Sequence, residues 1–455
     1  MKGRFGYRSA FLGVLIVFLT SCTVGPNYTP PQARVPAKWQ HGTAKKIISY
    51  GNWWRHFHDP VLNKLIEQKA PYSLNVQIAE ARIEAARSLY KAAYAQLFPE
   101  LTANVFPPNA TGVDLAQVYG LFATFDIDLF GKKRAAKQKA QENLAAELAE
   151  KEFTILKLQA EIATAYFSLR ELQAKLRILR NNKIANNKIL HMLQSNYHKG
   201  TANYIGIAQQ KSLIETELAN KERNKALEIA MLQQLELLTG NGPGALTKLL
   251  HRYRPMPPMA PLINLTVPSE LLTRRPDIIA AEKRVAAAHA DLQAAWADLF
   301  PKITLGWLLA WQTQALTTNL LSLTGSQSAF FGLLDAPLLS LRLAKMIDVR
   351  KREKALTVLL YEMTVLNALH EVEIQYNYCK HYRLGAQHLQ RALTHKRVVF
   401  DVARDSYKKG VADFNGVLLA EEDMNRLQMA YTHQVLAYQI ALINLYKALG
   451  GDVVK

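Results

Sequence analysis

The sequence AAYAQLFP at residues 92–99 is repeated as AAWADLFP at residues 294–301. Other strings recur with the same order: AEAR at 79–82 and AEKR at 281–284, YHKG at 197–200 and YKKG at 407–410, LTG at 238–240 and ALG at 448–450. Self-similarity at one long spacing indicates an internal structural repeat. We therefore predict two halves with one plan, residues 61–254 and 269–455, joined by a Pro-rich linker at 255–268.

Each half contains a very long segment with a helical pattern. Residues 132–199 contain no Gly or Pro, and at about 1.5 Å per residue such a helix would be roughly 100 Å long. Leu156, Ala160 and Ala163 follow a spacing of three and four, which predicts packing against neighbouring helices in a bundle or coiled coil. The second half has its counterpart at 341–409, and shorter long helices are expected at 203–238 and 413–449.

Segments with alternating residue types lie between the Phe-Pro strings and the long helices. Residues 115–129 and 302–312 place apolar side chains on one face, and Trp307 and Trp311 suit a membrane interface. Both segments reach the ~9–11 residues with which a β-strand spans a bilayer. Their expected partners, at about 101–106 and 329–337, are shorter and less regular. An ordinary soluble hairpin covered by helices is the alternative interpretation.

Four strands cannot close a barrel in a membrane, because open edges leave backbone groups unpaired at several kcal/mol each. Three copies would supply about twelve strands, which is within the range of such barrels. The predicted fold class is therefore an α+β membrane protein. It would combine a long α-helical coiled-coil barrel with a transmembrane β-barrel, four strands per protomer, that an oligomer completes; completion by trimerisation is what the resemblance described below implies.

The first residues have the features of an export signal. Three basic residues precede an apolar run at 10–19 that is well below the ~20 residues of a membrane-spanning helix, and LTSC follows at 19–22. LTSC resembles the bacterial lipobox, which implies a signal peptide at 1–21 and a lipid-anchored arm at 22–60. Cys22 would carry a diacylglycerol thioether and an N-acyl chain such as palmitate, and Thr23 in place of Asp implies the outer membrane. A chance cysteine after a signal peptide is the alternative.

Composition alone does not identify a partner. The 455 residues are 49% apolar, enough for a large core, and the net charge of +19 is scattered over the helical segments. We predict no nucleic-acid partner. Cys379 is the only cysteine besides Cys22, so packing must stabilise the chain without an intrachain disulfide framework.

No pattern indicates an enzyme, a cofactor or a metal site. HFHD at 56–59 offers possible metal ligands, but two histidines two residues apart are weak evidence. HEVE at 370–373 lacks the second histidine of a helical zinc motif. A Gly-rich phosphate loop and a serine nucleophile elbow are also absent from the sequence.

Three strings resemble one family over nearly the whole mature chain. CTVGPNYTP at 22–30, FDIDLFG at 125–131 and LLTRRPDI at 271–278, followed by Ala281-Glu282, are similar to the TolC-like outer-membrane factors, and especially to their lipidated OprM and NodT branch. This resemblance implies a homotrimer in the cell outer membrane of a Gram-negative bacterium, with a helical tunnel in the periplasm. A periplasmic membrane-fusion adaptor and an inner-membrane pump of RND or ABC type would dock on it, and small molecules such as drugs would leave through it.

The resemblance also implies roles for the two helix turns. Tyr197, Gly200 and Thr201 match one adaptor-docking tip, and Tyr407, Gly410 and Val411 match the other. A helix cap without a partner is the alternative for either turn.

Relatives place acids in a segment resembling VDVLDA to ring a closed aperture, whereas this chain has NGVLLA at 415–420. Gly416 and Leu419 replace the two carboxylates, and Asp413 is the only acid nearby before Glu421. An acidic ring that binds cations is therefore in doubt. We take Asp413, Gly416 and Leu419 as gate candidates, with Leu419 forming an apolar constriction that closes by dewetting.

Two other functions remain open at this stage. A type I protein-secretion channel would share every feature above and differ only in its cargo. A periplasmic coiled-coil lipoprotein without a pore would share Cys22 and the long helices, but it would not need the alternating segments.

Overall fold

The structure, a computed structural model, describes residues 24–41, 51–106, 117–200, 203–316, 320–337 and 340–451. The expected signal peptide, Cys22 and Thr201 lie outside these residues. The chain divides into two compact units, and each unit contains segments from both halves of the repeat. The sheet unit comprises Met1–Ala33, Ala81–Ala149 and Ile278–Thr364. The tip unit comprises Arg34–Glu80, Glu150–Asp277 and Val365–Lys455.

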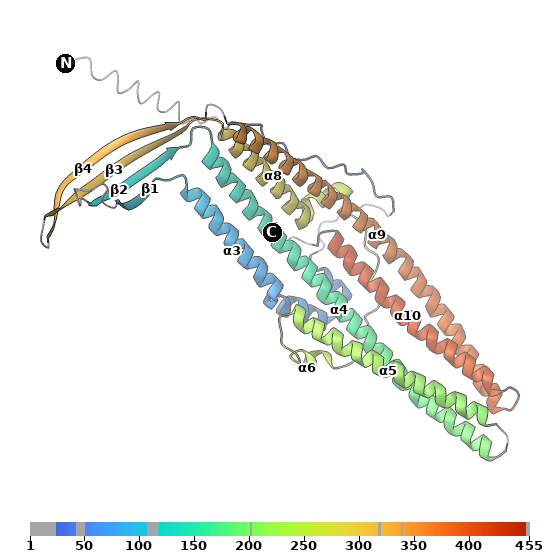
Figure 1. Ribbon diagram of the computed structural model, residues 1–455. Helices are drawn as coiled ribbons and strands as arrows, with labels where there is room; N and C mark the ends of the chain where they lie inside the picture. Colours follow the sequence, from blue (N-terminus) through green and yellow to red (C-terminus); the bar gives the residue numbers. More distant parts are fainter. Residues whose placement is uncertain are drawn as a thin grey trace. The chain divides into compact units, whose positions relative to one another are not determined.

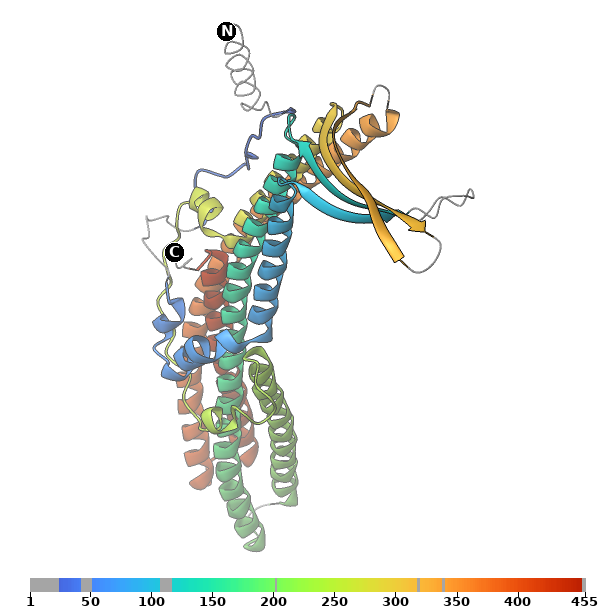
Figure 2. The same ribbon diagram turned by 90° about the vertical axis from the view of Figure 1, so that its left-hand side faces the viewer.

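A curved, four-stranded antiparallel sheet lies in the sheet unit, in the order β1-β2-β3-β4 (Figures 1 and 2). Its strands are β1 (Glu100–Phe106), β2 (Gln117–Ile127), β3 (Lys302–Leu316) and β4 (Leu320–Asp335). The central pair, β2 and β3, joins the two halves of the repeat, with Ile127 opposite Ile303. The sequence halves therefore contribute one hairpin each to a single sheet.

The fourth strand corrects one expectation. It begins at Leu320, well before the expected start near residue 329, and it is the longest strand with 16 residues. Pairing with β3 continues to the end of the hairpin, where Leu316 lies opposite Leu320. The intervening string SLTGSQS at 322–328 consists mostly of small and polar residues, so its strand character depends on the partner β3 more than on its own pattern.

The repeated Phe-Pro strings mark the change from helix to strand. Helix α3 (Leu74–Ala95) and helix α8 (Pro276–Ala297) both end three residues before the Phe. A proline disfavours helical geometry at the residue before it. Strands β1 and β3 begin directly after the two prolines. The junction is packed, because the rings of Phe130 and Phe300 stack with centroids 4.7 Å apart.

Long helices account for most of the remaining described chain. They are α4 (Lys132–His198), α5 (Tyr204–Leu238), α9 (Leu341–Lys408) and α10 (Phe414–Ala448). Shorter elements are η1 (Trp53–Phe57), α2 (Pro60–Lys64), η2 (Leu65–Lys69), η3 (Ala70–Tyr72), α6 (Thr247–Leu250), η4 (Pro268–Glu270) and α7 (Leu271–Arg274). Among the described residues, none of the helices has an apolar stretch sufficient for a membrane span.

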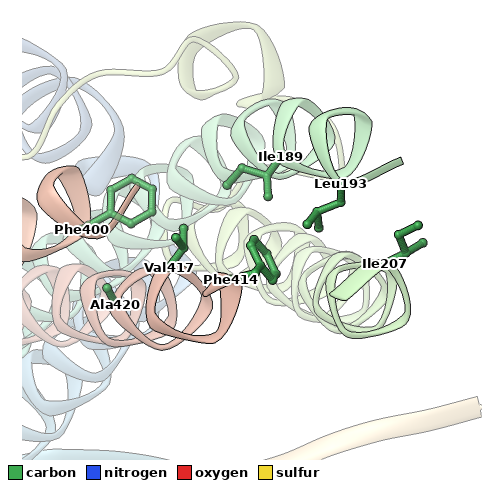
Figure 3. Packing of buried hydrophobic residues seen from close by; sticks show 7 residues of the cluster. All are labelled: Ile189, Leu193, Ile207, Phe400, Phe414, Val417 and Ala420. Atoms are coloured by element: carbon green, nitrogen blue, oxygen red, sulfur yellow. The ribbon is translucent and has the colours of Figure 1, made fainter. Parts of the chain in front are cut away.

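One apolar cluster packs the end of the tip unit. Helix α4 contributes Ile189 and Leu193, α5 contributes Ile207, α9 contributes Phe400, and α10 contributes Phe414, Val417 and Ala420 (Figure 3). All seven side chains are buried. The cluster therefore fixes the two helix hairpins, α4–α5 and α9–α10, against each other.

Candidate functional site

The first helix turn follows α4. Gly200 has a φ of 72°, in the left-handed region that glycine adopts without a Cβ penalty. Asn203 then caps α5, because its side-chain oxygen accepts a hydrogen bond from the backbone nitrogen of Ile205 at 3.1 Å. Tyr197 is exposed, and its ring contacts the ring of Tyr204 with centroids 5.9 Å apart. The turn thus presents two aromatic side chains at the surface.

The second turn has the same backbone plan with different side chains. Gly410 has a φ of 74°, and Asp413 caps α10 by accepting a hydrogen bond from the backbone nitrogen of Gly416 at 3.3 Å. Tyr407 differs from Tyr197, because it packs on the apolar cluster and its ring contacts Phe414. Val411 is largely exposed. The structure brings the two turns together, since Asn196 donates a hydrogen bond to the Tyr407 hydroxyl at 3.4 Å.

The three gate candidates lie along the first turns of α10. The Asp413 carboxylate serves as the helix cap, and Gly416 has open space around the position of a Cβ. Leu419 is 63% exposed, whereas Val417 and Ala420 point into the apolar cluster. In a single protomer, Leu419 is therefore an apolar side chain on the uncovered face of α10.

A buried polar cluster above the apolar cluster was not anticipated from the sequence. The Glu217 carboxylate accepts hydrogen bonds from three side-chain amides: Asn182 at 3.3 Å, Asn186 at 2.8 Å and Asn425 at 3.3 Å. Glu421, one helical turn before Asn425, is 2% exposed. Burial raises the pKa of Glu421 to about 7, helped by the nearby carboxylates of Glu217 and Glu422. Burial also raises the pKa of Glu217, against the lowering effect of its amide hydrogen bonds.

A sequence signal for this cluster does exist. Asn182 and Asn186 are four residues apart on one helix, and so are Glu421 and Asn425 on another, which places each pair on one helix face. Each pair interrupts an otherwise apolar stripe. A polar pair at such a spacing indicates a buried contact only when the facing helix is known, and the sequence does not supply that information.

The string LLTRRPDI lies at a buried junction between helices α8, α9 and α10. Arg275 donates from Nη1 to Glu371 of α9 at 2.9 Å and to the carbonyl oxygen of Ala448 at the end of α10 at 2.7 Å. Its remaining nitrogens bind Asp277. Pro276 is the first residue of α8, where the missing N–H is not needed. One side chain thus joins the start of α8 to α9 and α10.

The string FDIDLFG connects strand β2 to helix α4. Asp128 accepts hydrogen bonds from the backbone nitrogens of Lys133 and Arg134 at 3.1 and 2.9 Å, and from the Arg134 side chain. The two backbone donors belong to the first turn of α4, where N–H groups lack helical partners. Gly131, with a φ of 82°, allows the sharp passage between the two elements. This string is therefore a capped strand-to-helix turn.

The strings LTG and ALG are helix ends that lie against backbone. Gly240 follows α5 with a φ of 69°, and a Cβ there would overlap the carbonyl oxygen of Tyr72. Gly450 follows α10 with a φ of 90°, and a Cβ would lie 3.1 Å from the carbonyl oxygen of Arg274. Tyr72 and Arg274 hold equivalent places before α3 and α8. The repeat thus preserves the same helix-end contact in both halves.

The HFHD string has structural roles in the tip unit. Asp59 caps α2 through the backbone nitrogens of Val61 and Leu62 and accepts a hydrogen bond from Tyr166 at 2.6 Å. His56 stacks on the ring of Tyr446 and lies 3.0 Å from its hydroxyl. The described residues contain no group of three or more His, Cys, Asp or Glu side chains placed to hold a metal ion.

The sequence and the fold of this chain are similar to those of known outer-membrane proteins. The chain is 29% identical over 456 residues to the pyoverdine export outer membrane protein OpmQ of Pseudomonas putida KT2440, covering 93% of each chain. It is 27% identical over 465 residues to the probable efflux pump outer membrane protein SepC of Pseudomonas putida F1, covering 96% of this chain and 95% of that one. The solved outer-membrane channel OprN superposes with a TM-score of 0.85 at 25% identity, covering 94% of this chain and 99% of that one.

The fold class expected from the sequence, long helices combined with an antiparallel sheet, is confirmed by this likeness to a channel. The model of the family described as outer membrane efflux protein matches residues 65–241 and 267–451, one segment for each half of the repeat. The chain belongs to the outer membrane efflux protein family.

Proposed function

We propose that three copies of this chain form the exit duct of a tripartite efflux system in the outer membrane of a Gram-negative bacterium. The observation that carries this proposal is the uncovered sheet. Within the described strands, the outer edges of β1 and β4 have no strand partner. Phe330, Leu333 and Leu334 of β4 are exposed apolar side chains, Phe330 at 72%. Open edges and bare apolar surface are suited to neighbouring copies and lipid.

Strand direction allows the sheet to close. Because the four strands alternate in direction, β1 and β4 run opposite ways, so β1 of one protomer can pair antiparallel with β4 of the next. Three protomers would give a barrel of about twelve strands. The test is the mass of protein extracted with detergent from separated outer membranes. A trimer is expected; a monomer or dimer would leave the strands with no barrel to complete.

The lipid anchor at Cys22 is part of the proposal. Residues that follow it are held on the sheet unit: Gly25 lies near Trp296, Gln293 donates to the carbonyl oxygen of Pro26 at 3.2 Å, and the ring of Tyr28 contacts His289. Mass spectrometry of the mature N-terminus should find the diacylglycerol thioether and the N-acyl chain. The Cys22→Ala protein should lack both, and an unmodified Cys22 in the wild type would refute the anchor.

The helix turns are the proposed docking surface for a periplasmic adaptor, through which an inner-membrane pump of RND or ABC type would supply cargo. Exposed Tyr197, Tyr204 and Val411 support this role, because they offer apolar contact area at the ends of the hairpins. Relatives are named for toluene efflux, pyoverdine export and cation efflux, and we propose a small-molecule cargo for this chain. Deleting the gene and measuring susceptibility to a panel of compounds tests it against the alternative cargo, a secreted protein.

The proposed gate is an apolar constriction at Leu419. A ring of leucines excludes water from a narrow pore, whereas a ring of carboxylates would hold water and cations. Leu419→Asp should therefore raise single-channel conductance in planar bilayers and increase antibiotic entry. Ile205→Asp is the matched control, since Ile205 is also 63% exposed and lies in the first turn of α5. Unchanged conductance in Leu419→Asp would eliminate this gate.

A further inference from the structure

The buried polar cluster of the tip unit comprises Asn182, Asn186, Gln210, Glu217, Glu421 and Asn425, and several of its oxygen atoms lack a hydrogen-bond donor. The amide nitrogens of Asn186 and Asn425 are used on Glu217, and that of Gln210 on the carbonyl oxygen of Asn186 at 3.4 Å. Four buried oxygen atoms have no donor among the described residues: Asn186 Oδ1, Gln210 Oε1, Glu421 Oε2 and Asn425 Oδ1. Asn186 and Gln210 are completely buried. A positive charge or a hydrogen-bond donor is therefore missing from this cluster.

Within the described part of the chain, the groups that act on Glu421 and Glu217 include no basic side chain. Glu421 is acted on by the carboxylates of Glu217 and Glu422, and Glu217 by the amides of Asn182 and Asn186; no Lys, Arg or His is among these described groups. Asp423 on the same helix pairs instead with Lys396 and Arg426. Two ionised carboxylates without a counter-charge are unstable in a buried site, whereas a single negative charge on Glu217 is already stabilised by three amides.

We propose that Glu421 binds a proton in the resting tip unit and that its release loosens α10 from α4 and α5. The protonated carboxyl provides the missing donor to one of the neighbouring amide oxygens. Release of the proton leaves a second buried negative charge beside Glu217, which favours separation of the helices and entry of water. The apolar cluster, whose residues Val417 and Ala420 precede Glu421 on α10, would then pack less tightly as well. Proton release from Glu421 would thus link pH to opening of the helix ends.

The raised pKa of Glu421 determines how the stability of the folded protein changes with pH. Its folded-state pKa is about 7, above the ordinary value of 4.5, so the folded protein holds a proton that the unfolded chain has lost. The contribution of protonated Glu421 to the unfolding free energy should be greatest below about pH 4.5 and should decrease as pH rises towards 7. The pH range from 5 to 8 is therefore the informative one.

The experiment uses the full-length protein in detergent. The melting temperature of the wild type should fall by several degrees between pH 5 and pH 8, and that of Glu421→Gln, which mimics the protonated group, should fall much less. Glu215→Gln is the matched control, because Glu215 is exposed on α5 two residues from Glu217. Infrared difference spectra between the two pH values should show loss of a protonated carboxyl in the wild type and not in Glu421→Gln. Equal pH dependence in the wild type and Glu421→Gln, or no carboxyl signal, would overturn the proposal.

Two further arms separate the alternatives. The same oxygen atoms could accept a hard metal ion, so melting is repeated at pH 8 with calcium and with a chelator; rescue of the wild type by calcium would assign the site to a metal instead of a proton.

The link to opening rests on the proposed channel function. Wild-type conductance should be greater at pH 8 than at pH 5, with Glu421→Gln nearly insensitive. Channels of equal conductance at both pH values would refute the link, whereas no channels at all would refute the exit duct and leave the melting and infrared results to decide the proton site.

Discussion

Arg275 and Asp277 are joined by two parallel hydrogen bonds, from Nε to Oδ1 at 3.0 Å and from Nη2 to Oδ2 at 2.8 Å. The same guanidinium donates to Glu371 and to the Ala448 carbonyl oxygen at the end of α10, so its removal takes a charged donor from all three partners, although Glu371 keeps its ion pair with Lys447 at 2.9 Å. We expect Arg275→Met to lower the unfolding free energy by roughly 2–4 kcal/mol, below the upper end for buried pairs because the acids reach solvent. Arg275→Lys should lose less, since it keeps the charge without the fork.

Thermal unfolding in detergent measures this loss. Arg274→Ala is the neighbouring control, because Arg274 forms an ion pair with Glu270 that is partly exposed, and it should cost less than about 1 kcal/mol. Equal losses at the two positions would mean that the buried junction contributes little.

The glycines at helix ends should differ sharply in their tolerance of substitution. Gly410 and Gly240 have similar positive φ angles, but Gly410 has open space whereas Gly240 lies against the Tyr72 backbone. Gly410→Ala should cost about 1 kcal/mol from the left-handed backbone alone. Gly240→Ala should cost clearly more and reduce the amount of protein in the outer membrane. Immunoblots of membrane fractions and melting curves provide the comparison, and equal effects would contradict the close contact at Gly240.

Two buried tyrosines offer a test of the charged acceptor at Asp59. Tyr166 donates to the Asp59 carboxylate, and Tyr438 donates to the carbonyl oxygen of Ala260. Tyr166→Phe should cost about 1.5–3 kcal/mol, and Tyr438→Phe about 0.5–1.5 kcal/mol, because hydrogen bonds to charged groups are stronger. Melting curves of the two single variants in the same detergent decide the order. The reverse order would show that Asp59 is satisfied by the α2 backbone alone.

The thiol of Cys379 should be inert in the folded protein. Burial raises its pKa to about 12 from an ordinary 9.0, which lowers the thiolate fraction at pH 8 roughly a thousandfold. A thiol reagent should label Cys379 only after denaturation, and the Cys22→Ala protein removes any signal from the other cysteine. Fast labelling of the folded protein would show that α9 opens around this residue.

Most of the architecture could be predicted because it depends on local periodicity in the sequence. The long helices follow from residues 132–199 and 341–409 lacking helix breakers, apart from Gly385, and strands β2 and β3 follow from alternation. The early part of β4 could not be predicted, because SLTGSQS lacks a strand pattern of its own and forms a strand by pairing with β3. The role of Arg275 was equally hidden: its string was recognisable, but its partners Glu371 and Ala448 are 96 and 173 residues away.

The candidate site divides in the same way. Gly200 and Gly410 could be found from the repeated turn strings, since only the backbone at each turn demands them. Glu217 and Glu421 could not, because a carboxylate on a helix is usually solvated and only the packing of α5 against α10 shows that these two are enclosed. The proposed docking and gating roles of the turns stay predictions until partners and conductance are measured.

The paired helix lengths carry an evolutionary consequence. Helices α4 and α9 have 67 and 68 residues, and α5 and α10 have 35 each. One inserted residue advances a helix by about 1.5 Å and rotates everything after it by about 100°. An insertion in α4 alone would thus turn Ile189 and Leu193 away from Phe414 and displace one turn from the other. Insertions and deletions in this lineage should therefore be inherited in compensating pairs, one in each duplicate, so that the two copies of the ancestral unit diverge freely in sequence but not in length.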